Sequence, residues 1–117
     1  MVNIISNTLI VKVDGRNVCL VAGSLPTSGS SGCDSCMFLF SDDSWDMPDK
    51  SAVFWQDSDR RFEVPLGKGD CCEIPGGALE KDGWLFAGLI GRSGSRIQNT
   101  KTLLIPLCDG TRAGEPA

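Results

Sequence analysis

The sequence contains neither histidine nor tyrosine among its 117 residues. Histidine is the side chain that most often serves as a general base near neutral pH, and it is the commonest nitrogen ligand of zinc. Without it, no serine or cysteine has the usual partner that activates a nucleophile, and no lysine or carboxylate pair stands out by its spacing as a substitute. We therefore expect a protein that is not an enzyme and that uses no cofactor.

Long apolar runs and an excess of basic charge are missing as well. The longest apolar-rich segment, residues 84–90, is far too short to cross a bilayer, and residues 1–16 lack the basic start and apolar stretch of a signal peptide. The 11 lysines and arginines are outnumbered by 15 aspartates and glutamates, which gives a net charge of -4. This balance argues against nucleic acid or a membrane surface as a partner. Because a signal peptide is not recognised, we expect synthesis in the cytoplasm.

The chain does contain a series of short β-branched and aromatic runs, which are separated by glycine, proline, aspartate and serine. No segment keeps a helical period, so the pattern predicts seven or eight strands. They fall at residues 8–13, 17–22, 34–40, 51–56, 61–66, 71–74, 84–90 and about 97–107.

Short strands at this spacing predict an all-β fold, and their number in a chain of this length favours an immunoglobulin-like antiparallel β-sandwich of about seven strands. Asp14 and Gly15 lie between the first two strands and are typical of a tight hairpin. We expect one β-sandwich domain over residues 1–108 and a C-terminal Gly/Glu/Pro tail over residues 109–117.

Six cysteines are too few for a disulfide scaffold in a chain of this length, and free thiols are expected in the absence of a secretory signal. They are Cys19, Cys33, Cys36, Cys71, Cys72 and Cys108. Cys19, Cys36 and Cys108 stand in apolar, strand-like runs, where a thiol packs as a small hydrophobe. We therefore predict that these three side chains belong to the core.

The spacing Cys33-x-x-Cys36, combined with Cys71 and Cys72, allows a zinc site as an alternative. Tetrahedral ligation needs both thiolates of each pair to turn inward, whereas adjacent residues of a strand point to opposite faces. We favour the interpretation that Cys33 is a loop residue and Cys36 a core residue. A zinc-stabilised interaction module remains an alternative hypothesis.

Residues 41–49 form an acidic connection between two predicted strands. Its members include Asp42, Asp43, Trp45 and Asp46. A calcium-binding EF-hand loop needs glycine at position 6 and glutamate at position 12, and a count from Asp42 finds Met47 and Val53 there. We interpret the segment as a solvated loop, with Trp45 as an exposed aromatic residue that contacts a partner.

Two further groups of residues bear on binding. Trp55 and Trp84 lie in strand-like segments and are predicted to be core residues. Arg92 and Arg96 lie, with Lys101, in or beside a polar hairpin loop and form a small basic patch, although a solvated hairpin is the simpler interpretation. The candidate interaction residues are therefore Asp42, Asp43, Trp45, Asp46, Arg92 and Arg96.

The order of motifs from residue 51 to residue 117 is more specific. The aromatic segment SAVFWQDSDRRFEVPL is followed by CCEIPGGAL, in which Cys72, Ile74 and Pro75 form a Cys-x-Ile-Pro step. Next come GWLFAGLIG, which ends at Gly91, and NTKTLLIPLCDGTRAGEPA. This order resembles the small N-terminal domains of tailed-bacteriophage virion structural proteins, such as baseplate upper proteins and the bases of fibres.

The resemblance implies a structural protein of the virion, made in the cytoplasm of the bacterial host, that binds neighbouring virion proteins in a homo- or hetero-oligomeric assembly. It leaves open whether the position is the tail, the baseplate, a fibre base or the capsid. The predicted contacts are residues 24–32, the acidic loop and the tail. A carbohydrate- or host-surface-binding module, which uses Trp45 and its acidic neighbours, is the alternative.

Overall fold

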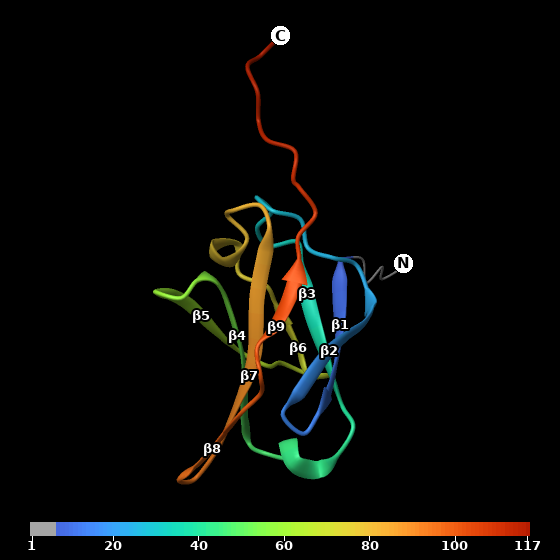
Figure 1. Ribbon diagram of the computed structural model, residues 1–117, viewed down its shortest axis with the longest axis vertical. Helices are drawn as coiled ribbons and strands as arrows, with labels where there is room; N and C mark the ends of the chain where they lie inside the picture. Colours follow the sequence, from blue (N-terminus) through green and yellow to red (C-terminus); the bar gives the residue numbers. More distant parts are fainter. Residues whose placement is uncertain (1–6) are drawn as a thin grey trace.

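The computed structural model describes residues 7–117, so the first six residues of the expected domain lie outside the described range (Figure 1). Its elements are β1 (Thr8–Asp14), β2 (Asn17–Gly23), β3 (Ser35–Phe40), η1 (Asp43–Trp45), β4 (Asp49–Asp57), β5 (Arg60–Pro65), β6 (Cys71–Glu73), η2 (Gly76–Ala78), β7 (Trp84–Ser93), β8 (Arg96–Asn99) and β9 (Leu103–Pro106). The all-β prediction is confirmed for this range. None of its helices is long and apolar enough to span a membrane.

The strands form two sheets that enclose a common core (Figure 1). The first sheet has the order β2-β1-β3-β6. The second has the order β5-β4-β7, and both β8 and β9 pair with β7 as well. β1, β3, β4 and β7 are therefore the strands with neighbours on both sides, and they provide most of the core.

The four-stranded sheet is mixed, which corrects the prediction of a purely antiparallel sandwich. β1 and β3 run parallel, from Thr8 opposite Ser35 to Val13 opposite Phe40. Parallel strands cannot be joined by a tight turn: here the chain returns along β2, and residues 24–34 then lead from the end of β2 to the start of β3. The Asp-Gly hairpin fixed only the partner on one side of β1, so the sequence did not specify how β3 would pair.

A bulge divides the expected final strand into β8 and β9, which raises the number of strands in the described range to nine. Ile90 pairs with Asn99 and Ala87 pairs with Leu103, so two residues of β7 face residues 100–102. The backbone N–H of Leu89 donates a hydrogen bond to Thr100 Oγ1 at 2.9 Å, which replaces a regular contact between the strands. Bulges of this kind bend a strand and redirect its side chains.

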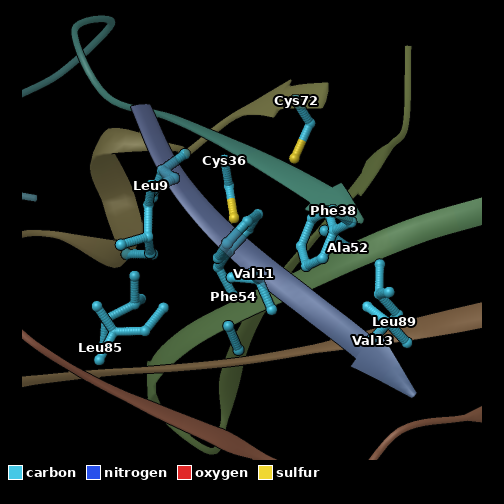
Figure 2. Packing of buried hydrophobic residues seen from close by; sticks show 14 of the residues in the cluster. Leu9, Val11, Val13, Cys36, Phe38, Ala52, Phe54, Cys72, Leu85 and Leu89 are labelled. Atoms are coloured by element: carbon cyan, nitrogen blue, oxygen red, sulfur yellow. The ribbon is translucent and has the colours of Figure 1, made fainter. Parts of the chain in front are cut away.

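The core lies between the inner faces of the two sheets (Figure 2). Its members on the four central strands include Leu9 of β1, Phe38 of β3, Phe54 of β4 and Leu85 of β7. The other members are Val11, Val13, Cys36, Trp45, Ala52, Cys72, Ile74, Ala78, Leu79, Ala87, Leu89, Ile105 and Leu107. Each buried leucine or phenylalanine contributes about 1.5–3 kcal/mol by leaving water, so this cluster supplies the main driving force for folding.

The structure also corrects the predicted orientation of β4 and β7, which are apolar on both faces. The inner face of β7 carries Leu85, Ala87 and Leu89, and Trp84 lies outside with 52% of its surface exposed. Trp55 is only half-buried on the outer face of β4. Strand periodicity determines which residues share a face, and only packing against the other sheet determines which face is covered.

Two of the three cysteines predicted to be in the core are exposed. Cys19 lies on the outer face of the edge strand β2, where Val18 and Leu20 turn inward instead. Cys108 follows the buried Leu107 and is exposed beyond the end of β9. Cys36 is buried as predicted, and Cys33 lies exposed in the preceding loop.

Candidate interaction surfaces

Trp45 is a buried residue at one end of the sandwich, and the prediction that it is exposed was wrong. Only 2% of its surface is accessible, its Nε1–H donates a hydrogen bond to the Gly15 carbonyl oxygen at 2.6 Å, and its ring lies 5.9 Å from that of Phe40. Asp42 caps the short helix η1 by accepting the backbone N–H of Ser44, and this turn directs the indole inward. Trp45 therefore offers no platform for a carbohydrate.

The predicted acidic and basic residues do lie at the same end of the molecule. The η1 loop and the β7–β8 turn both occupy the end opposite the C-terminal tail (Figure 1). Asp43, Asp46 and Arg96 are exposed there. Arg92 of β7 lies opposite Asp49 of β4 in the register of the two strands. Charges of both signs therefore occur at this end of the molecule.

Two of these charged groups already have partners within the fold. The guanidinium of Arg92 holds the Glu63 carboxylate through contacts of 2.7 and 3.3 Å, and this lowers the pKa of Glu63. Hydrogen bonds from the Ser44 hydroxyl and backbone lower the pKa of Asp42. Their charges therefore contribute to local structure as well as to the surface.

The four candidate zinc ligands are arranged as one buried pair and two more accessible thiols. Cys36 of β3 lies directly opposite Cys72 of β6, and both point into the core (Figure 2). Burial raises the pKa of Cys72 to about 12 and that of Cys36 further still. Cys71 is half-buried, Cys33 is exposed, and in residues 7–117 no group of three or more Cys, Asp and Glu is placed to hold a metal ion.

Part of the outer face of the four-stranded sheet is apolar. Val21 of β2 and Leu39 of β3 are 49% and 47% exposed. With Lys12, Phe40 and Ser41 they line an open depression of about 230 Å³. Its lining is almost entirely apolar, and its one charge is the Lys12 ammonium.

The outer face of the five-stranded sheet carries a row of stacked side chains. Arg61, Trp55, Phe86 and Leu104 are consecutive cross-strand neighbours on β5, β4, β7 and β9. The Trp55 and Phe86 rings are 5.9 Å apart and nearly parallel, and the Arg61 Cζ lies 4.2 Å from the Trp55 centroid. Because β5 and β7 flank β4 on opposite sides, both faces of the Trp55 indole are covered and its edge faces outward.

A hollow of about 200 Å³ lies beside this row, at the β8–β9 bulge. Gly88 leaves a gap in the outer face of β7 because it has no side chain. The hollow is lined by Val53, Trp55, Arg61, Gly88, Leu89, Ile90, Asn99, Thr100 and Thr102. One side is therefore apolar, and the other carries an amide and two hydroxyl groups.

The beginning of the tail is attached to the sandwich. The Gly110 N–H donates to Ser28 Oγ at 3.0 Å, and the Ser28 hydroxyl donates to Asp82. Arg112 forms an ion pair with Asp82 at 2.8 Å, and the last residues extend away from the body (Figure 1). Residues 24–32 and 109–117, both predicted contacts, therefore meet at one end of the molecule.

Sequence reasoning missed the two apolar outer faces and the hollow. A detectable signal was present in residues 84–90, where both alternating sets of side chains are apolar, so one set had to face outward. Gly88 in a strand interior was a second signal, because such a glycine often marks a bulge or a site of close approach. Comparisons with protein-family models, with curated proteins and with solved structures found no match.

Proposed function

We propose that this protein is a non-enzymatic structural domain of a tailed-phage virion and that it binds neighbouring virion proteins. The motif order from residue 51 onward supports the setting. The two β-sheets support the sandwich architecture, for which an immunoglobulin-like arrangement with a parallel β1–β3 pair is the finer proposal. The protein is made in the host cytoplasm and reaches its place by assembly into the particle.

One observation supports protein binding above all: the apolar outer face of the four-stranded sheet. Soluble monomers rarely expose a continuous apolar patch without a use for it, and such patches mark protein contacts. Val21 and Leu39 are half-exposed on adjacent parts of this face, around the single charge of Lys12. A partner surface that is apolar, with one carboxylate opposite Lys12, matches this pattern.

The edge of this sheet offers a second contribution to binding. Among residues 7–117, β2 pairs with β1 alone, and no strand of this described range pairs with the backbone N–H and C=O groups on the other side of β2. A strand of a neighbouring protein can add to such an edge, and side chains then provide the specificity. Repetition of one modest contact around a particle gives high avidity.

Particle incorporation tests the proposal. Peptide mass spectrometry of density-purified phage particles from the source culture measures the copy number relative to the capsid and tail proteins. We expect a fixed copy number for the wild-type chain. Absence from particles, with abundant protein in the lysate, would overturn the virion setting.

A pair of variants tests the proposed surface. The double variant Val21→Ser with Leu39→Ser removes apolar area from the outer face, and Leu104→Ser makes the same chemical change at an exposed position on the other sheet. When each replaces the wild-type chain, we expect at least a tenfold loss of incorporation for the double variant and no loss for Leu104→Ser. Equal incorporation of all three proteins, at equal thermal stability, would assign the contact to another surface.

A further inference from the structure

The hollow at Gly88 differs in chemistry from the apolar depression on the opposite sheet. Val53, Ile90 and the outward edge of Trp55 form its apolar side. Asn99, Thr100 and Thr102 form its polar side, and Arg61 provides a cation at the rim. We propose that this hollow binds one unit of an anionic saccharide, a sugar ring that carries a carboxylate.

The polar side of the hollow is the first step of the argument. Thr100 Oγ1 accepts the Leu89 N–H, and within the described part of the chain its hydroxyl hydrogen donates to no protein group. Within residues 7–117, the Asn99 amide and the Thr102 hydroxyl make no hydrogen bond to protein. Three neighbouring polar side chains are therefore available to a ligand at the bulge.

The match to a sugar follows from the hydrogen bonds that the Asn99 amide and the two threonine hydroxyls require once a ligand excludes water from them. A buried donor or acceptor that loses water without gaining a partner destabilises the complex. A protein side chain brings one or two polar atoms, which leaves part of this rim unpaired. A pyranose ring has an apolar C–H face for the Val53 and Ile90 side and adjacent hydroxyls for the amide and hydroxyl side.

The negative charge of the ligand follows from Arg61. Its Nε–H donates to the Ser58 carbonyl oxygen at 3.2 Å, and its guanidinium lies over the Trp55 ring. Among the described residues it forms no ion pair, whereas the neighbouring Glu63 is engaged by Arg92. The terminal N–H groups of Arg61 are therefore placed to hold a carboxylate, a geometry that arginine favours.

Nuclear magnetic resonance titration of the whole ¹⁵N-labelled chain tests the site with three probes: glucuronic acid, glucose and inorganic phosphate. We expect saturable shifts of the Gly88, Leu89 and Thr100 amides with glucuronic acid, in the millimolar range for a single unit. Binding of glucose is expected to be at least tenfold weaker. No saturable shift with either sugar, or equal shifts with inorganic phosphate alone, would overturn the proposal.

Matched variants locate the binding. A Cβ atom at Gly88 would lie 3.2 Å from Thr100 Oγ1, so Gly88→Val fills the hollow, while Gly114→Val adds the same atoms in open space. We expect Gly88→Val to abolish the shifts, Gly114→Val to preserve them, and Arg61→Gln to reduce glucuronic acid binding to the level of glucose. Should Gly88→Val not fold, the exposed double variant Asn99→Ala with Thr102→Ala serves instead, and unchanged affinity in it would contradict the site. The titration is independent of particle incorporation, so this proposal and the proposed function fail separately.

Discussion

The indole of Trp45 lies so close to Gly91 that a Cβ atom added at residue 91 would be 3.0 Å from Cζ3 of the ring and 2.6 Å from Met47 Sδ. Gly91 belongs to the central strand β7, whereas Trp45 comes from a polar loop. The missing side chain at residue 91 thus makes the space into which the loop tryptophan packs. This relationship closes one end of the sandwich.

The first prediction follows directly from this contact. Gly91→Ala is expected to lower the free energy of unfolding by about 1–3 kcal/mol, because the added methyl group forces the indole or the strand to move. Gly114→Ala adds the same group where no atom lies within 4 Å, and it is the control. Urea denaturation of both variants measures the difference, and equal midpoints would show that Trp45 moves aside without cost.

The second prediction concerns thiol reactivity. Burial raises the pKa of Cys72 to about 12 and raises that of Cys36 as well, and a thiol in this state is a poor nucleophile. In native protein at pH 8, we expect Cys19, Cys33 and Cys108 to react with an alkylating reagent while Cys36 and Cys72 remain unmodified. Peptide mass spectrometry before and after unfolding in urea provides the measurement. Labelling of Cys72 as fast as Cys33 in native protein would contradict the buried pair.

The third prediction concerns the buried carboxylate of Asp34. Only 5% of this residue is exposed, its Oδ2 has no hydrogen-bond partner among the described residues, and burial raises its pKa. A raised pKa means that the charged form is less favourable in the fold, so the contribution of Asp34 to stability falls as pH rises through the folded-state pKa. Asp34→Asn is therefore expected to increase stability at pH 7 and to have little effect at pH 3.

Glu63 provides a comparison of opposite sign for the same measurement. Arg92 lowers the pKa of Glu63, so its contribution is present above the unfolded-state pKa and is lost as pH falls. Both side chains are about two-fifths exposed, so screening by solvent keeps the contribution of the pair small. Glu63→Gln should lower stability slightly at pH 7 and leave it unchanged at pH 3. Thermal denaturation of Asp34→Asn and Glu63→Gln at pH 3 and pH 7 provides the measurement. If the stability of the two variants, relative to wild type, changed in the same direction between these pH values, the opposite pKa shifts of Asp34 and Glu63 would be refuted.

The fourth prediction concerns the attachment of the tail. Ser28→Ala removes the acceptor of the Gly110 N–H and the donor to Asp82, and we expect a loss of about 1–2 kcal/mol in stability. Cleavage by trypsin after Arg112 should also become faster, because the segment detaches more often. Ser30→Ala changes the same loop without touching either contact. Equal cleavage rates for the two variants would mean that Ser28 does not hold the tail.

The sequence predicted most strands to within one or two residues, and the reason is local. Asp14 and Gly15 specify a tight turn, and residues 61–66 alternate apolar with other side chains, so both signals are complete within a few residues. The division of the last strand was missed because it depends on register. Leu89 bonds to Thr100 only when β7 and β8 are already paired.

The sequence by itself determined that this protein is all-β, where its strands lie and which side chains share a face of each strand. Only the tertiary structure decided which face is inside. Residues 84–90 are apolar on both sides, and the choice that buries Leu85 and exposes Trp84 depends on the space left by the opposite sheet. The burial of Trp45, a residue in an acidic loop, also depends on tertiary structure. Its hydrogen bond to Gly15 and the gap at Gly91 arise only when three distant segments meet.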